Sequence, residues 1–273
     1  METQKKKIIS RREYEWLRTF ESLEPHEQAK VDEYEKENIQ VFPKNPAPEK
    51  KPEVKKILIT KELIWKHFKN SFRLHTGKDF IETPDTIRNI APIITYFAKD
   101  EGFFKCDNLV RKVGQTVLNP SFEKGLLIIG NYGNGKTSTM NAIQKMMLCY
   151  RIPGWFKSHK SHELVTIFEG LDTPESRAEY FKKFGEHRLY IDDVKKEKIA
   201  SNFGKVDLIR EILEKRYDNK AVTHLTCNYR EGDATGNIED ALVEFGERYG
   251  GHLYDRIFEM FNIIEFKGRT FRT

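Results

Sequence analysis

Residues 124–143, KGLLIIGNYGNGKTSTMNAI, combine an apolar run, a glycine-rich loop and a lysine followed by two hydroxyl residues. The spacing Gly130-x-x-x-x-Gly135-Lys136-Thr137 fits the pattern G-x-x-x-x-G-K-[ST] of phosphate-binding loops. Glycines let backbone N–H groups turn inward, and these donors surround phosphate oxygens together with the N-terminus of the following helix. Lys136 would reach the outer phosphates, and Thr137 would place its hydroxyl on Mg²⁺. The alternative is a glycine-rich turn that binds nothing.

The residues on either side of this loop predict a strand before it and a helix after it. Leu126–Ile129 is an apolar run typical of a buried strand, and Ser138–Leu148 has helical periodicity. In that context a nucleotide site is the favoured interpretation. The candidate nucleotide-binding residues in the loop are Gly130, Asn131, Gly133, Asn134, Gly135, Lys136, Thr137 and Ser138.

A pair of aspartates follows a second short apolar segment, Leu189–Ile191. Asp192 and Asp193 come where this predicted strand would end. An enzyme that hydrolyses a nucleotide in a phosphate-binding loop needs carboxylates for Mg²⁺ and for the attacking water. We therefore expect Asp192 to hold Mg²⁺ together with Thr137, and Asp193 to polarise the water. The alternative is that the two aspartates simply begin a loop.

Further candidates lie near the C-terminus. The strand-like segment 221–230 brings Asn228 to its end, where an amide can reach the γ-phosphate or the water, although an Asn there can also cap a turn. A guanidinium stabilises the charge on a transferring phosphoryl group and can come from a neighbouring subunit. Arg256, on a predicted helix, is the best candidate for that role. Arg269 and Arg272 could reach the nucleotide of their own chain, and any of these arginines could be an ordinary surface residue.

Composition narrows the class of protein. The 273 residues are 33% charged and 38% apolar, with a net charge of +5 and a pI of about 8.8, which permits contact with nucleic acid without demanding it. Three widely spaced cysteines predict neither a disulfide framework nor a zinc site, and they suit a reducing cytoplasm. There is no signal-peptide pattern and no apolar run of membrane-spanning length. We therefore expect a cytoplasmic protein without a membrane partner.

Four parts follow one another along the chain. Residues 1–41 are dense in charge and predict a helical appendage, either a solvated helix pair or a docking element for a protein partner. Residues 42–56 hold four prolines and a lysine run, which predicts an extended linker. Residues 57–120 predict a helical lead-in. Over 121–273, short apolar runs alternate with helical patterns, which indicates a parallel sheet flanked by helices.

Several local elements can be placed within these parts. A short amphipathic helix is predicted around residues 10–23. Thr83 is the expected N-cap of a helix that has Pro84 in its first turn, and Pro92 predicts a kink or break in that helix. An amphipathic helix is predicted over 205–220.

In order along the chain, several segments resemble the DnaC-type helicase loaders of the AAA+ ATPases, with the IstB-type transposition helpers as close relatives. These segments are KGLLIIGNYGNGKTS, YIDDVKKE, LIREILEKRYDN, HLTCNY, YGGHLYDRIFEMFN and KGRTFR. The resemblance covers about residues 60–273. It implies an α/β AAA+ P-loop NTPase with a parallel sheet flanked by helices, preceded here by a helical N-terminal region. It also implies ATP and Mg²⁺ binding, an ATP-bridged homo-oligomer, contact with single-stranded DNA, and delivery of the replicative helicase in DNA replication.

The resemblance also implies roles for single residues. Lys136 and Thr137 match the Walker A lysine and threonine, and Asp192 matches the Walker B aspartate that holds magnesium. Asn228 matches the first sensor, and Arg256 matches the arginine finger.

Other positions depart from the family pattern or extend it. Asp193 sits where many AAA+ proteins have glutamate, which bears on the turnover rate. Glu197 matches an acidic position after Walker B, whereas His252 stands where relatives usually carry an arginine. Arg272 resembles the family's terminal arginine and would contact the nucleotide, with Thr270 in place of a serine.

Four functions stay open at this point. The first is an ATPase that loads a DNA helicase, with Arg256 of one subunit facing Lys136 of the next. The second is a transposition helper on duplex DNA. The third is a P-loop kinase for a small molecule, which the lack of an arginine-rich lid between 150 and 185 disfavours. The fourth is a nucleotide-gated binding module with little turnover, which the short side chain of Asp193 keeps open.

Overall fold

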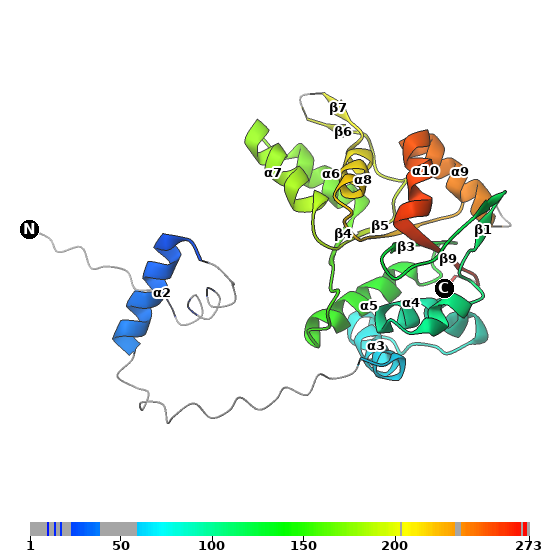
Figure 1. Ribbon diagram of the computed structural model, residues 1–273, viewed down its shortest axis with the longest axis horizontal. Coiled ribbons are helices and arrows are strands. Elements are labelled where there is room, and N and C mark those ends of the chain that lie inside the picture. Colours follow the sequence, from blue (N-terminus) through cyan, green and yellow to red (C-terminus); the bar gives the residue numbers. More distant parts are fainter. Residues whose placement is uncertain are drawn as a thin grey trace, which may run out of the picture. The chain divides into compact units, whose positions relative to one another are not determined.

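A computed structural model of the chain describes residues 10, 14, 17, 23–38, 59–202, 204–232, 236–268, 270 and 271. The chain forms two compact units, Met1–Ile57 and Leu58–Thr273 (Figure 1). The predicted boundaries at residues 41, 56 and 120 stay predictions.

The first unit contains helix α2, Pro25–Asn38. The side chains of Leu17 and Val31 are buried, and the rings of Tyr14 and Tyr34 stack with their centroids 4.5 Å apart. Tyr14 and Leu17 are helical, Ser10 and Leu23 are not, and the other residues of the helix expected around 10–23 lie outside the described residues.

The second unit is built around a five-stranded sheet in which every neighbouring pair of strands is parallel. Its strands are β3 (Gly125–Gly130), β4 (Lys157–Lys160), β5 (Leu189–Asp192), β8 (Thr223–Cys227) and β9 (Phe261–Phe266). The order across the sheet is β4-β5-β8-β3-β9, so β8 lies between the strand that leads into the glycine-rich loop and the strand that ends in Asp192. The α/β fold predicted from the sequence, with a parallel sheet flanked by helices, is confirmed.

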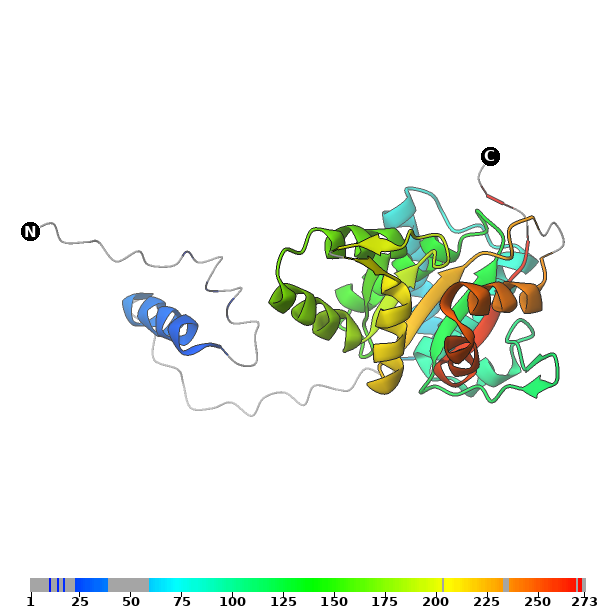
Figure 2. The same cartoon turned by 90° about the horizontal axis from the view of Figure 1, so that it is seen from above.

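Helices cover both faces of this sheet and form an apolar core on each. The helices are α3 (Lys61–Thr76), α4 (Pro84–Ala98), α5 (Lys136–Cys149), α6 (Ser161–Glu169), α7 (Pro174–Gly185), α8 (Leu208–Asp218), α9 (Ile238–Tyr249) and α10 (Gly251–Met260). Leu126 and Ile128 of β3 belong to the core under α3, α4 and α5, while Leu127 and Ile129 belong to the core under α6 to α10. This alternation follows from the two-residue period of a strand. Figure 2 shows α8, α9 and α10 on one side of the sheet.

The two N-terminal helices of this unit begin at side-chain caps. Thr60 caps α3, and Thr83 with Thr86 forms a reciprocal capping box at the start of α4, as the sequence predicted for Thr83. Of the predicted kink or break at Pro92, the break is wrong, because α4 runs on through this residue, and the kink stays a prediction. Burial of Ile93 and its apolar neighbours outweighs the one helical hydrogen bond that Pro92 cannot donate.

Short elements connect the larger ones. They are the 3₁₀ helix η2 (Glu101–Lys105) and the strands β1 (Lys112–Val113), β2 (Thr116–Val117), β6 (Ala200–Ser201) and β7 (Lys205–Val206). The strand β7 pairs with β6, which is why α8 begins at Leu208 and the helix predicted from residue 205 starts late.

Candidate functional site

The glycine-rich loop joins the end of β3 to the start of α5. A Cβ on Gly130 would lie 2.3 Å from the carbonyl oxygen of Phe266, so only glycine fits beside β9. Gly135 has φ +91°, a conformation that glycine adopts without strain, and α5 begins at the next residue. The N-terminal end of this helix therefore lines a cavity, as a phosphate site requires.

Lys136 extends along the inside of this loop. Its side chain is buried, and Nζ donates to the carbonyl oxygens of Gly130 at 2.7 Å and Asn131 at 2.8 Å. It also donates to Oδ1 of Asn228 at 3.0 Å, from the end of β8. The lysine that the sequence assigned to the outer phosphates is thus joined to the residue that it assigned to γ-phosphate sensing.

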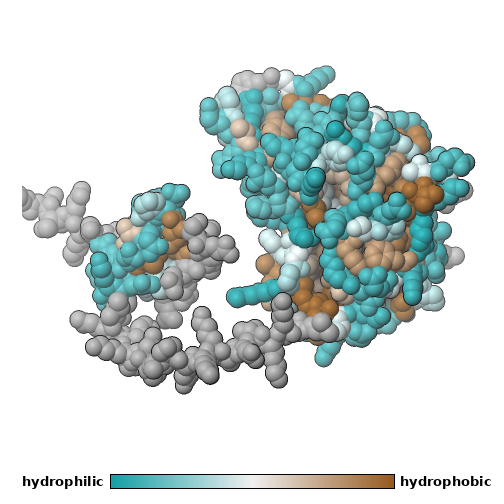
Figure 3. Space-filling view, in the orientation of Figure 1, coloured by the Kyte–Doolittle hydropathy of each residue, from teal (hydrophilic) through white to brown (hydrophobic). Residues whose placement is uncertain are grey.

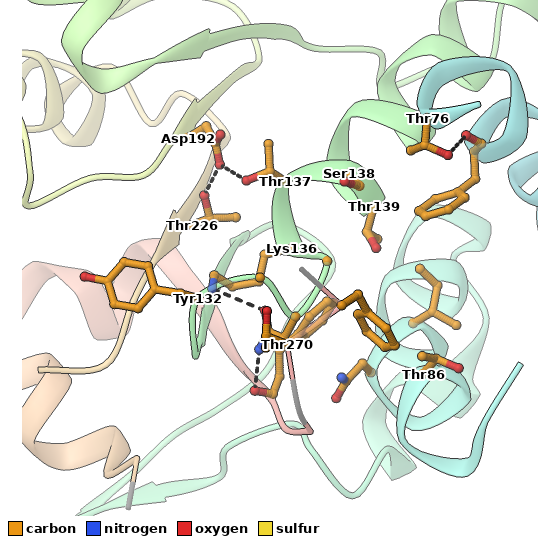
Figure 4. Close-up of a pocket in the computed structure, with 18 of the residues that line it drawn as sticks. Thr76, Thr86, Tyr132, Lys136, Thr137, Ser138, Thr139, Asp192, Thr226 and Thr270 are labelled. Atoms are coloured by element: carbon orange, nitrogen blue, oxygen red, sulfur yellow. Dashed lines mark hydrogen bonds between the residues drawn. The ribbon is translucent and has the colours of Figure 1, made fainter. Parts of the chain in front are cut away.

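Asp192 lies at the end of β5 with its carboxylate in the cavity (Figure 4). Its Oδ1 accepts three hydroxyl hydrogen bonds, from Thr137 at 2.9 Å, Tyr190 at 2.6 Å and Thr226 at 2.5 Å. Its Oδ2 makes no hydrogen bond to any described residue. Burial raises the pKa of Tyr190 well above its usual value, so this phenol stays protonated and donates.

A divalent cation fits these donors. Mg²⁺ prefers oxygen ligands and is commonly held by one or two carboxylates together with substrate phosphates. The Thr137 hydroxyl and the open oxygen of Asp192 offer hard oxygen atoms beside the phosphate loop, so these two residues would hold Mg²⁺. Among the described residues, no group of three or more His, Cys, Asp or Glu side chains forms a separate metal site.

Asp193 follows in a left-handed backbone conformation, φ +55°. Its Oδ1 accepts from Nδ2 of Asn228 at 2.8 Å, and its N–H donates to Oγ1 of Thr226 at 3.0 Å. The hydroxyl of Ser161 donates to its carbonyl oxygen at 2.8 Å. Aspartate is among the few non-glycine residues enriched in this region of φ/ψ space, and this gives a local reason for Asp instead of Glu here.

The cavity extends from the phosphate loop to α3 and α4, with a volume of ≈ 970 Å³. Its apolar lining comes from Phe72, Phe80, Ile81 and Ile90 of α3, α4 and the segment between them, and from Phe266 and Phe271 beside the phosphate loop. Thr76, Thr86 and Asn89 add polar groups to the same lining (Thr76 and Thr86 are labelled in Figure 4). An apolar slot with a few polar groups suits a flat nucleobase at the end of a triphosphate.

The C-terminal segment is fastened at the mouth of this cavity. Asn89 exchanges two hydrogen bonds with the backbone of Lys267, at 2.7 and 3.0 Å. Farther on, the N–H of Phe271 donates to the carbonyl oxygen of Gly133 at 2.9 Å. Arg272, the predicted nucleotide contact in this tail, lies outside the described residues, as does Arg269.

The remaining predicted residues fall into two groups. Gly133, Asn134 and Ser138 line the cavity, although the amide of Asn134 donates to the Phe266 carbonyl at 2.9 Å and serves the loop itself. Arg256 does not line the cavity of its own chain. Its guanidinium lies 4.4 Å from the centre of the Tyr217 ring.

Glu197 has a structural setting that the sequence did not reveal. Its carboxylate is buried, accepts from the Tyr249 hydroxyl at 2.8 Å and pairs with Arg248 at 3.0 Å. Burial raises its pKa. His252 is exposed at the start of α10.

Sequence reasoning missed three contributors to the site. Tyr190 and Thr226 hold Asp192, and part of the apolar lining comes from α3, α4 and the segment between them. Tyr190 stands two residues before Asp192, and Thr226 stands two before Asn228. Since alternate residues of a strand share a face, this spacing was the available signal for both.

No family model matches the chain, and no curated protein matches it by sequence. Similar solved structures include a DnaC helicase loader, 21% identical, with 73% of this chain and 99% of that chain covered and a TM-score of 0.47. DnaI is 18% identical, with coverage of 72% and 93% and a TM-score of 0.47. The replication initiator DnaA bound to AMPPCP and single-stranded DNA is 13% identical, with coverage of 70% and 49% and a TM-score of 0.41.

The similarity to helicase loaders that the motifs predicted is therefore found among solved structures as well. None of the helices in the described ranges is both long and apolar enough to cross a membrane. In the view of Figure 3, the surface of the second unit is largely hydrophilic with scattered apolar patches.

Proposed function

We propose that the chain hydrolyses ATP with Mg²⁺ in the cavity at the ends of β3, β5 and β8. The observation that carries this proposal is the bridge made by Asn228, which accepts from Lys136 at 3.0 Å and donates to Asp193 at 2.8 Å. The Asn228 amide thus connects Lys136, which would bind the outer phosphates, with Asp193, which would orient the attacking water. A γ-phosphoryl group held by Lys136 would lie within reach of both.

The chemistry follows from these positions. The loop N–H groups and Lys136 would bind the β- and γ-phosphates. Thr137 and Asp192 would hold Mg²⁺, which neutralises charge on the phosphate oxygens. Asp193, fixed by Asn228, would accept a hydrogen bond from water and orient its oxygen towards the γ-phosphorus. The new bond would join that oxygen to phosphorus while the bond from phosphorus to the β,γ-bridging oxygen breaks. ADP would leave with that electron pair, and the proton lost by the water would pass to Asp193 and then to solvent.

The wider role that we propose is that of a helicase loader. ATP would close the interface between subunits of a homo-oligomer, with Arg256 completing the site of the neighbouring subunit. The oligomer would bind single-stranded DNA and deliver a replicative helicase to it. The order of the motifs along residues 60–273 supports this proposal, together with the position of Arg256 outside the cavity of its own chain.

ATP turnover by the full chain tests both proposals. It is measured alone, with single-stranded DNA and with duplex DNA, for the wild type and for Lys136→Ala and Arg256→Ala. We expect stimulation by single strands, loss of turnover in both variants, and recovery when the variants are mixed, because mixed interfaces contain some complete sites.

Three other results would change the assignment. Stimulation by duplex DNA alone would favour the transposition helper. Consumption of ATP only in the presence of an acceptor molecule would favour the kinase. Binding of ATP without turnover under any condition would refute hydrolysis and leave a nucleotide-gated binding module.

A further inference from the structure

The loop that follows Asp192 is clamped against α9. The N–H of Lys195 donates to the Tyr249 hydroxyl at 2.8 Å, and that hydroxyl donates to Glu197 at 2.8 Å. Both Asp193, at φ +55°, and Lys195, at φ +78°, have left-handed backbone conformations. Such conformations are strained for non-glycine residues, so the contacts around the loop must hold them in place.

The side chain of Lys195 turns inward from this loop and is only 7% exposed. Its ammonium forms an ion pair with Glu244 of α9 and donates to the carbonyl oxygen of Asn228 at 2.9 Å. A lysine in a surface loop ordinarily keeps its ammonium in water, and burying that charge is costly unless it is paired and hydrogen-bonded. The ammonium of Lys195 is both paired, with Glu244, and hydrogen-bonded, to the carbonyl oxygen of Asn228. Asn228 is also the residue whose side-chain amide bridges Lys136 and Asp193.

We propose that Lys195 is a positioning residue for ATP hydrolysis, an inference that rests on the proposed function. Its ammonium fastens the main chain of Asn228 to α9 and thereby fixes the amide that holds the carboxylate of Asp193. The helix α9 leads through Gly250 into α10, which carries Arg256. The same contact thus connects the hydrolytic site of a subunit to the arginine that it presents to its neighbour.

The test compares two lysines of the same loop in the full chain. Lys195→Met removes the buried ammonium and keeps an unbranched apolar side chain. Lys198→Met is the matched control, because Lys198 is 68% exposed and its only ion pair among described residues is with Glu169 at the surface. ATP turnover, the dissociation constant of AMPPNP and the thermal unfolding midpoint are measured for each.

We expect Lys195→Met to lower kcat by about tenfold or more while the AMPPNP dissociation constant changes by less than about threefold. Lys198→Met should leave both within about twofold. Lys195→Arg, which keeps a cation for Glu244, should recover part of kcat. If Lys195→Met does not fold, Lys195→Met with Glu244→Gln removes the unpaired carboxylate, and the same loss of kcat is expected.

Two results would overturn the inference in distinguishable ways. If the wild type hydrolyses ATP and folded Lys195→Met has the same kcat per bound nucleotide, Lys195 is only structural and the ATPase proposal stands. If the wild type shows no turnover, both the proposed function and this inference fail.

Discussion

Arg216, in α8, is a fully buried guanidinium with a hydrogen bond for each of its five N–H groups. Its Nε donates to Oγ1 of Thr223 at 2.7 Å. The other four bonds, of 2.6 to 2.8 Å, go to the carbonyl oxygens of Phe184, Glu186, His187 and Val222. These acceptors lie at the end of α7, in the segments that lead into β5 and β8, and at the first residue of β8. One side chain therefore holds the beginnings of the two strands whose far ends carry Asp192 and Asn228.

The cost of removing Arg216 can be worked out from these contacts. A hydrogen bond to a charged group contributes at least about 1.5 kcal/mol, so Arg216→Met loses roughly 7 kcal/mol from five bonds. Burial lowers the pKa of Arg216 from 12.5 to about 10, and methionine recovers that desolvation cost of about 3 kcal/mol. We therefore expect the free energy of unfolding to fall by about 4 kcal/mol. Arg216→Lys keeps the charge with three donors, and its two lost bonds should cost about 3 kcal/mol.

Urea unfolding followed by far-ultraviolet circular dichroism measures both changes, with the slope against urea as a check on two-state behaviour. Arg210→Met is the matched control, because Arg210 lies on the same helix, is exposed and pairs only with Glu214 at 3.0 Å among described residues. It should change stability by less than about 0.5 kcal/mol. A value for Arg216→Met within about 1 kcal/mol of wild type would refute the reasoning, because it would mean that desolvation cancels the hydrogen bonds.

Three further predictions concern other side chains. Burial lowers the pKa of His224 to about 3, against 6.5 in the unfolded chain. Its contribution to the free energy of unfolding is therefore complete above pH 6.5 and is lost as the pH falls towards 3. Urea unfolding between these pH values should show that the free energy of unfolding of His224→Asn depends less on pH than that of the wild type. Because Asp193 is left-handed, Asp193→Glu should lower the unfolding midpoint without raising turnover, whereas Asp193→Asn should keep ATP binding and lose turnover. Tyr217→Leu removes the ring beside Arg256 and should lower ATP turnover severalfold, whereas Tyr217→Phe keeps the ring and should not. Mixing Tyr217→Leu with Lys136→Ala should restore ATP turnover. If the mixture stays inactive, that result contradicts a role of Arg256 across the interface.

The features of the fold that were predicted correctly depend on neighbours along the chain. The apolar run 126–129 and the cap at Thr83 are local patterns, and both appear as expected. The chain does not break at Pro92, because burial of the apolar side chains of α4 is a tertiary effect that outweighs a local preference. The start of α8 was placed too early because the pairing of β7 with β6 cannot be read from helical periodicity.

The residues of the candidate site likewise differ in whether local sequence patterns could identify them. Residues that follow a predicted strand or belong to a motif, such as Lys136 and Asp192, were identified from spacing. The Tyr190 and Thr226 hydroxyls beside Asp192 and the inward turn of Lys195 were not, because they depend on which strands are neighbours and on a left-handed backbone. Even so, the bridge made by Asn228 agrees with its predicted position at the end of a strand beside Asp192.

The position of β8 between β3 and β5 explains how one strand serves both halves of the site. Thr226 and Asn228 are two residues apart and share a face. The hydroxyl of Thr226, deeper in the sheet, donates to Asp192 and accepts from the N–H of Asp193. Asn228, at the strand end, reaches Lys136 and Asp193. A one-residue slip of β8 would bring Cys227 to this face and remove the hydroxyl that both aspartates share. The register of this one strand, in which Ile128 stands beside Thr226, is therefore what sets the phosphate-binding loop and the two carboxylates in a single site.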